Sequence, residues 1–304
     1  VVFMSQDFGN TWSIISEDLT TDDPEKQQTA GGPAWPENTT AEYFCAVISL
    51  AESPVQPGVL WAGTDDGNLH VTMNRGENWK NVVNNIPDLP PESPVSHVEP
   101  SVTSAGLAYC SFDRHMLDDF QPYIYRTTDF GRTWIDIRGN LPDDAYIWVV
   151  REDPRDPKVV YAGTEKGIFV SFSRGGNWVK LHMDNLPNVP VHDILIHPQK
   201  NDLILGTHGR GIWIFDKIAF LQEISPELLG AEPYIFSIDS AMRFAAKPTR
   251  YGIGDREYRG QNPDYGALIT YYLPEELSGA ESIYLDILNE QRDVIRTLHD
   301  IHRK

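Results

Sequence analysis

Short runs of alternating apolar and polar residues fill the first two thirds of the chain, and turn residues separate them. From Tyr43 onward the runs are FCAVISL, VLWAGT, LHVTMN and WKNVV. Two further groups follow in the same order: SHVEPSVTSAG, LAYCSF, YIYRTT and TWIDIRG, then IWVVRED, VVYAGT, IFVSFS and NWVKLH. A period of two predicts strands, and a repeated unit of four strands is typical of a β-propeller blade.

Incomplete units are predicted on both sides of these three. Residues 1–18 supply the last two strands of a blade, whereas VHDILIHP, LILGT and IWIFD begin another, with IAFLQEI as its expected outer strand. We therefore predict an all-β fold, with propeller blades over residues 1–224 that form an incomplete ring. A linker over 225–262 and the start of an immunoglobulin-like β-sandwich over 263–304 should follow. The rest of the ring is expected from chain outside these residues or from a partner subunit.

An eight-residue frame recurs at the expected third turn of each unit, and we call it the box. Its copies are SQDFGNTW, TMNRGENW, TTDFGRTW and SFSRGGNW. Gly and Trp keep their places, whereas the third position varies between Asp, Asn and Ser. A turn that needs only a hydrogen-bond acceptor tolerates this variation, but a catalytic acid or a metal ligand does not. We therefore assign structural roles to Asp7, Trp12, Asn74, Trp79, Asp129, Trp134, Ser173 and Trp178.

Blade geometry sorts the turns onto two faces. The boxes join strands 3 and 4, so they should lie away from the turns between strands 2 and 3. Those 2–3 turns are rich in titratable groups and should gather near the axial mouth, where propellers commonly hold ligands. The catalytic candidates there are Asp65, Asp66, Asp118 and Asp119, and the ligand-binding candidates are Arg114, His115, Glu165, His208 and Arg210.

Each of these candidates also has an ordinary structural explanation. Asp-Gly and Glu-x-Gly sequences form hairpin turns, and Asp118 and Asp119 are placed to clamp Arg114 or Arg126. The remaining histidines lack metal-ligand spacing, so we predict neither a metal site nor a cofactor, with Ca²⁺ bound by the turn carboxylates as the one alternative.

Composition and charge narrow the class of partner. A net charge of −19 argues against nucleic acid or an anionic membrane surface. The sequence holds no apolar run of the roughly 20 residues that span a bilayer. The two cysteines, Cys45 and Cys110, lie in apolar strand contexts and are expected to be buried thiols, with their pairing left open.

The boxes resemble the Asp-box, or BNR, repeat of sialidase-like and sortilin-type β-propellers. The segments FDRHMLDDFQPYIYRTTDFGRTW, VVREDPRDPKVVYAGTEKGIFVSF and LILGTHGRGIWIFD extend the resemblance to secreted bacterial BNR-repeat proteins related to the sortilin ectodomain and to xyloglucanase-type propellers. The resemblance implies a propeller, an extracytoplasmic location (periplasmic, cell-surface or secreted), and a protein or carbohydrate partner. The tail from ALITYYL to DVIRTL is similar to the immunoglobulin-like module that often follows such propellers.

Two functions remain open at this point. The favoured one is a non-catalytic binding or assembly module, because folding alone explains the repeated residues. The alternative is a glycoside hydrolase whose acid and base come from Asp65 or Asp66 and from Asp118 or Asp119, since such enzymes use a pair of carboxylates.

Overall fold

The computed structural model describes residues 1–29, 43–183, 185–225, 228, 232–241, 266–274 and 283–299. The chain divides into two compact units, Val1–Gln222 and Glu223–Lys304. The division falls beside the boundary predicted at residue 224. Each unit is described by itself below.

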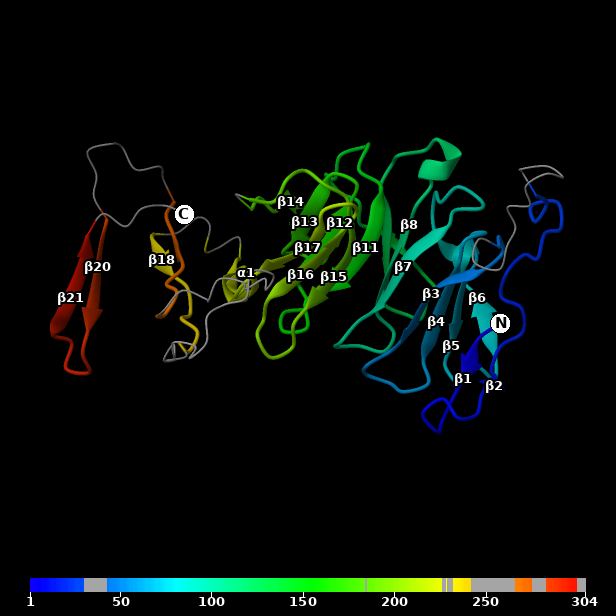
Figure 1. Ribbon diagram of the computed structural model, residues 1–304, viewed down its shortest axis with the longest axis horizontal. Coiled ribbons are helices and arrows are strands. Elements are labelled where there is room, and N and C mark those ends of the chain that lie inside the picture. The colour runs from blue at the N-terminus through cyan, green and yellow to red at the C-terminus, as the bar shows by residue number, and fades with distance from the viewer. Residues whose placement is uncertain are drawn as a thin grey trace, which may run out of the picture. The chain divides into compact units, whose positions relative to one another are not determined.

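Three four-stranded antiparallel meanders follow one another along the first unit (Figure 1). The first contains β3 (Val47–Glu52), β4 (Leu60–Thr64), β5 (Leu69–Thr72) and β6 (Trp79–Asn81). The second contains β7 (Val95–Pro100), β8 (Ala108–Phe112), β9 (Tyr123–Thr127) and β10 (Ile135–Asp136). The third contains β11 (Ile147–Glu152), β12 (Val160–Thr164), β13 (Gly167–Ser171) and β14 (Val179–Lys180).

Partial sheets flank these three. The hairpin of β1 (Phe3–Met4) and β2 (Ser13–Ile14) precedes them, and β15 (Val191–Ile196), β16 (Leu203–Thr207) and β17 (Gly211–Phe215) follow. The first strands of the successive blades, β3, β7, β11 and β15, lie next to one another. This is the arrangement of blades around an axis, so the predicted all-β propeller with incomplete blades is confirmed.

The outer strand expected from IAFLQEI is wrong. Ala219–Glu223 forms the short helix α1, which buries Leu221. Neighbouring Ile218 is also fully buried. Apolar residues at 218, 220 and 221 fit one side of a helical turn as well as they fit a strand, and the sequence does not separate the two.

Two buried clusters fill the spaces between successive blades. The first joins Trp61 and Leu69 of one sheet to Cys110 and Tyr125 of the next. The second joins Tyr109 and its neighbours to residues of the third sheet. The sheet β7–β10 therefore buries both faces, one against the preceding blade and one against the following blade.

The box glycine sits where two blades meet. Gly76, Gly131 and Gly175 all have a positive φ, and an added Cβ would strike Ile15, Val82 and Ile137, respectively. Each struck residue stands three positions after the box tryptophan of the preceding blade. The absence of a side chain at these glycines thus sets how closely neighbouring blades approach.

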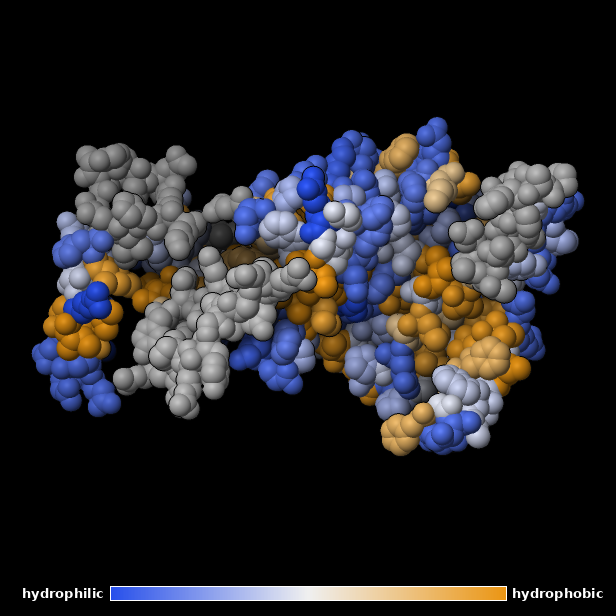
Figure 2. Space-filling view, in the orientation of Figure 1, coloured by the Kyte–Doolittle hydropathy of each residue, from blue (hydrophilic) through white to orange (hydrophobic). Residues whose placement is uncertain are grey.

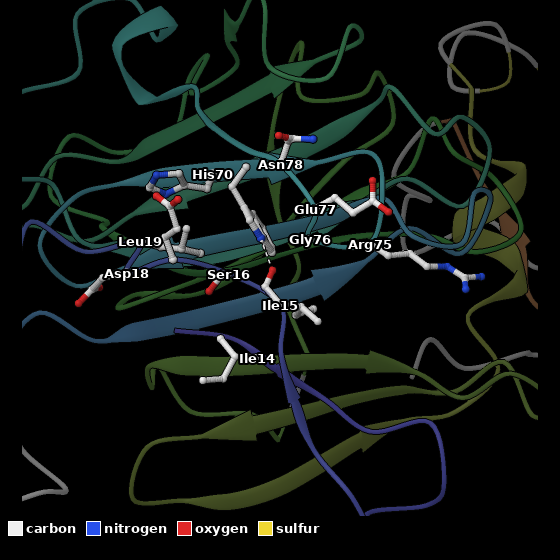
Figure 3. A pocket seen from close by; sticks show the side chains of 12 residues that line it. Ile14, Ile15, Ser16, Asp18, Leu19, His70, Arg75, Gly76, Glu77 and Asn78 are labelled. Atoms are coloured by element: carbon white, nitrogen blue, oxygen red, sulfur yellow. Dashed lines mark hydrogen bonds between the residues drawn. The ribbon is translucent and has the colours of Figure 1, made fainter.

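The box tryptophan also contacts the preceding blade. Trp79 Nε1 donates to the Ile15 carbonyl at 2.8 Å, and Trp178 Nε1 donates to the Ile137 carbonyl at 2.8 Å (Figure 3 shows the Ile15 bond). Trp134 packs edge-to-face on Trp61 at 6.0 Å. Trp12 differs, since 62% of its surface is exposed.

The variable third position of the box acts as an acceptor within the turn. Asp129 Oδ1 accepts the Thr133 N–H at 2.9 Å, and Asn74 Oδ1 accepts the Asn78 N–H at 3.0 Å. The Ser173 hydroxyl accepts the Asn177 N–H at 3.1 Å. Hydrogen bonding lowers the pKa of Asp129 despite the opposing effect of burial.

The second unit contains two antiparallel strand pairs among its described residues. They pair β18 (Tyr234–Ile235) with β19 (Tyr271–Tyr272), and β20 (Tyr284–Leu288) with β21 (Val294–His299). A turn from Asn289 to Asp293 joins the second pair. Most of the predicted linker lies outside the described residues, and the immunoglobulin-like assignment stays a prediction.

Candidate functional site

Four 2–3 turns come together on one face of the first unit. Their first residues are Asp65, Asp113, Glu165 and His208, and each donates its backbone N–H to a carbonyl just before the first strand of its own blade. The partners are Ala46, Pro94, Tyr146 and Pro190. The four residues thus occupy equivalent positions in four successive blades.

These turns line a pocket of about 1040 Å³, which we call the turn pocket. Its size is at the upper end of the range of ligand sites. Its lining residues come from all four blades and from one loop segment: Lys26, Phe44, Asp65, Glu92, Pro94, Asp113, His115, Met116, Leu117, Tyr146, Trp148, Glu165, His192 and His208.

A row of five rings crosses three blades along this pocket. His115 stacks on Tyr146 at 4.9 Å with 14° between the rings, and Tyr146 meets Trp148 at 5.4 Å. Trp148 lies 3.9 Å from His192, which lies 4.9 Å from His208. The row therefore presents a continuous aromatic wall.

Carboxylates hold the rings in place. Glu165 Oε2 accepts the Tyr146 hydroxyl at 2.9 Å and the Trp148 indole N–H at 3.3 Å. Asp113 Oδ2 lies 2.7 Å from His115 Nδ1. Burial, followed by the bond to Glu165, raises the pKa of Tyr146, so its hydroxyl stays protonated and remains a donor.

The other titratable groups of the pocket respond to burial. Burial raises the pKa of Asp65, although the Ala46 N–H donates to its carboxylate at 2.8 Å. Burial, with a smaller contribution from His208, lowers the pKa of His192 and favours its neutral form. Lys26 forms an ion pair with Glu92.

Several sequence-predicted residues lie outside the lining of the turn pocket. Asp66 is buried and accepts the Thr21 N–H and the Thr64 hydroxyl. Asp119 binds Arg114 Nε at 3.0 Å and accepts the Tyr123 hydroxyl. Hydrogen bonds lower the pKa of Asp119 against the effect of burial.

The remaining predicted residues are placed by local geometry. Asp118 is exposed and caps the short 3₁₀ helix His115–Leu117 with a φ of 59°. Arg114 also donates to the Pro91 carbonyl and the Ser93 hydroxyl, which ties its loop to the preceding segment. Arg210 is exposed and does not line the pocket. The structure thus brings together Asp65, His115, Glu165 and His208 of the predicted set.

The candidates predicted from the sequence did not include Asp113, Tyr146, Trp148 or His192. Tyr146, Trp148 and His192 lie within one residue of the start of the first strand of a blade. The links between blades lead into these strands, and they lie on the same face as the 2–3 turns. That topological rule was available from the sequence and would have pointed to these positions.

A second cavity of about 540 Å³ lies between the β1–β2 hairpin with its following segment and the first complete sheet (Figure 3). Ile14, Leu19, His70 and the box residues from Arg75 to Trp79 line it. Burial lowers the pKa of His70. The cavity belongs to the junction between two blades.

The described residues include no group of three His, Cys, Asp or Glu side chains suited to a metal ion. The two cysteines are free thiols, and Cys110 is buried. None of the helices in the described ranges is both long enough and apolar enough to cross a membrane.

No protein-family model matches the chain, and no curated protein matches it. Solved structures do match. The GH74 xyloglucanase of Xanthomonas campestris shares 15% identity at a TM-score of 0.46, over 56% of this chain and 29% of that one. YCF48 bound to a D1 peptide shares 13% at a TM-score of 0.42, over 57% of this chain and 51% of that one.

A third match is the extracellular domain of a putative one-component system, BT4673, of B. thetaiotaomicron. It shares 16% identity at a TM-score of 0.44, over 60% of this chain and 22% of that one. The chain thus spans between about a fifth and a half of the length of these structures. The predicted resemblance to xyloglucanase-type propellers is confirmed as a likeness in fold, and it carries no conclusion about activity.

Proposed function

We propose that the first unit is a non-catalytic binding module whose ligand, a protein or a carbohydrate, occupies the turn pocket. The observation that carries this proposal is the row of five rings that crosses three blades. Aromatic rings held rigidly in a concave site supply contact area for sugar rings or for apolar side chains at little entropic cost.

The charges that line the pocket favour a neutral or cationic ligand. Asp65, Glu92, Asp113 and Glu165 face a single lysine, Lys26, which is already paired with Glu92. Among the described lining residues there is no arginine to bind a carboxylate or phosphate by its two-pronged geometry. An anionic ligand would therefore meet like charge without compensation.

Two of the predicted catalytic acids are already engaged. Asp66 accepts hydrogen bonds from Thr21 and Thr64, and Asp119 binds Arg114 and Tyr123. A carboxylate held in this way is poorly placed to exchange protons with a substrate. These contacts therefore favour a binding module over a hydrolase that uses Asp66 or Asp119 as its acid or base.

A hydrolase remains the second candidate because of one observation. Asp65 and Glu165 line the same pocket, and burial raises the pKa of Asp65, which is the direction that suits a general acid. Turnover of an aryl β-glucoside or a soluble β-glucan by the full chain, lost in Asp65→Ala, would establish the enzyme in place of the binding module.

Binding is tested by screening the full chain against immobilised polysaccharides and a random peptide library. Trp148→Ala removes the centre of the ring row, whereas Trp213→Ala removes a ring that does not line the pocket. We expect a binder whose affinity falls roughly tenfold or more in Trp148→Ala, as a lost aromatic contact of about 1.4 kcal/mol requires, and stays unchanged in Trp213→Ala.

A binder with equal affinity for the wild type and Trp148→Ala would overturn the proposed site. His208→Ala provides a second readout, because this ring ends the row and is exposed, so its loss leaves the core intact. The extracytoplasmic location is part of the proposal and rests on the sequence resemblance. Fractionation of cells that make the native protein would test it, and recovery in the cytoplasm would contradict it.

A further inference from the structure

Glu165 engages only one of its two carboxylate oxygens in the part of the chain that the structure describes. Oε2 accepts the Tyr146 hydroxyl at 2.9 Å and the Trp148 indole N–H at 3.3 Å. Oε1 receives no hydrogen bond from a described residue, although Glu165 lines the turn pocket. An ionised carboxylate accepts through both oxygens, so Oε1 is available to a donor from a ligand.

Tyr146 and Trp148 form an angled pair of walls beside this carboxylate. Their rings stand at 64° to one another with centroids 5.4 Å apart, and both line the turn pocket. Because both donate to the same oxygen of Glu165, their orientations are fixed before a ligand enters. A long hydrocarbon stem can pack on such rings while its charged end reaches a carboxylate. We call Tyr146, Trp148 and Glu165 the carboxylate corner.

The cations near the carboxylate corner are already paired. Lys166, the next residue in the chain, forms an ion pair with Asp144 and is not part of the pocket lining. Lys26 lines the pocket but forms an ion pair with Glu92. Burial lowers the pKa of His192 and so favours its neutral form. The described lining thus supplies no free lysine or arginine to the carboxylate corner.

We propose that the carboxylate corner binds a lysine or arginine side chain from a segment of a partner protein. The ammonium or guanidinium group donates to Oε1 of Glu165, and the stem packs on Tyr146 and Trp148. The net charge of −19 attracts such a basic segment from a distance. The inference rests on the proposed binding function of the turn pocket, and it adds the chemical class of the ligand.

The rest of the lining favours a polypeptide over a cationic sugar. Phe44, Pro94, Met116 and Leu117 contribute apolar surface to the pocket. Their side chains offer no strong hydrogen bond to the many hydroxyls of a sugar, whereas apolar residues beside a lysine or arginine can pack on them. Figure 2 shows hydrophobic surface (orange) beside hydrophilic surface (blue) at the β8–β9 turn, which contains Met116 and Leu117.

Peptides selected by the full chain test the class of ligand. A random peptide library displayed on phage is selected against the immobilised protein, and the selected peptides are synthesised and measured by fluorescence polarisation. We expect a lysine or arginine at one shared position. Its replacement by norleucine or citrulline, respectively, removes the charge at similar length and should weaken binding roughly fivefold or more.

Glu165→Gln removes the charge of the corner but keeps an oxygen that can accept from Tyr146 and Trp148. It should weaken the basic peptide roughly fivefold or more, and it should change the affinity of the norleucine or citrulline peptide by no more than about twofold. A purely structural role of Glu165 would instead weaken both peptides by the same factor, and that result would contradict the inference.

Glu77→Gln is the matched control. Glu77 is exposed, belongs to a box and does not line the turn pocket, and its substitution changes the net charge by the same amount. Both peptides should bind Glu77→Gln as they bind the wild type. An equal loss for the basic peptide in Glu165→Gln and Glu77→Gln would show that only the overall charge attracts it, and would overturn binding at the corner.

The outcomes separate this inference from the proposed function. Peptides that lose affinity in Trp148→Ala but share no lysine or arginine would support the pocket and refute its specificity for a cation. Binding of chitosan oligosaccharides, with no peptide selected, would replace the polypeptide by a cationic sugar and overturn the inference. Failure to bind any peptide or polysaccharide would refute the proposed function, and this inference with it.

Discussion

Replacing Gly175 with alanine tests whether the box glycine sets the spacing between blades. Gly175 has a φ of 90°, and an added Cβ would lie 2.6 Å from Ile137 Cδ1 and 2.7 Å from Ile137 Cβ. A change of rotamer moves Cδ1, but Cβ is fixed to the backbone of the preceding blade. The two sheets must therefore separate locally to accept the methyl group.

Two effects lower the stability of Gly175→Ala. A positive φ costs an alanine roughly 1–2 kcal/mol relative to glycine. Forcing extra volume into a packed interface costs about 1–3 kcal/mol more. We expect Gly175→Ala to lower the free energy of unfolding by about 2–5 kcal/mol.

Gly209→Ala separates the two effects. Gly209 has a φ of 81°, but an added Cβ would meet nothing within 4 Å. This variant should show only the backbone cost of roughly 1–2 kcal/mol. The difference between the two variants then measures the contact between blades.

Urea unfolding followed by tryptophan fluorescence is the appropriate assay. All eight tryptophans lie before Glu223, so the signal reports the first unit. The free-energy change is read from the shift of the midpoint at unchanged slope. Equal losses in Gly175→Ala and Gly209→Ala would refute the role of the glycine in blade spacing.

Three further predictions concern single groups. Burial, assisted by the charge of Arg151, lowers the pKa of His97 to about 3. Between that pH and about 6.5, the unfolded chain binds more protons than the folded chain. Acidification from about pH 7 to 5 should therefore lower the free energy of unfolding by about 2 kcal/mol. His97→Gln should remove this part of the pH dependence in urea titrations, and an unchanged slope would contradict it. Asp129→Asn should be nearly neutral, because an amide oxygen still accepts the Thr133 N–H, whereas Asp129→Ala should cost about 1–2 kcal/mol of unfolding free energy. Trp178→Ala should lower the free energy of unfolding by about 3–5 kcal/mol, but Trp12→Ala should change it by no more than about 0.5 kcal/mol. Equal losses in the two variants, measured by urea unfolding, would contradict this difference in packing.

The repeat could be predicted from the sequence because its signals are local. Alternation gives the strands, and Gly with Trp at fixed spacing gives the turn and the inward ring. The burial of Trp134 and Trp178 followed from that pattern. The exposure of Trp12 did not, because it depends on which blade stands behind the hairpin.

The candidate site was only half predictable, and Asp65 and Asp66 show why. The two are adjacent in one turn and have the same chemistry, yet Asp65 lines the pocket whereas Asp66 is buried. The partner that engages Asp66 is Thr21, which lies 45 residues earlier in a loop without periodicity. No local pattern connects these residues. The ring contacts of Trp148 also cross between blades and become visible only in three dimensions.

The two faces of the propeller differ in what folding requires of their side chains. On the box face, the glycine and the tryptophan touch the preceding blade, so their identities are fixed by packing. At the first residue of each 2–3 turn, the hydrogen bond common to all four blades comes from the backbone N–H. The side chains of Asp65, Asp113 and Glu165 make further bonds that differ from blade to blade. Asp65, Asp113, Glu165 and His208 occupy this one position with three residue types. The bond that all four blades share does not depend on the residue type, so the side chain at this position can differ between blades, and for that reason we place the ligand on this face.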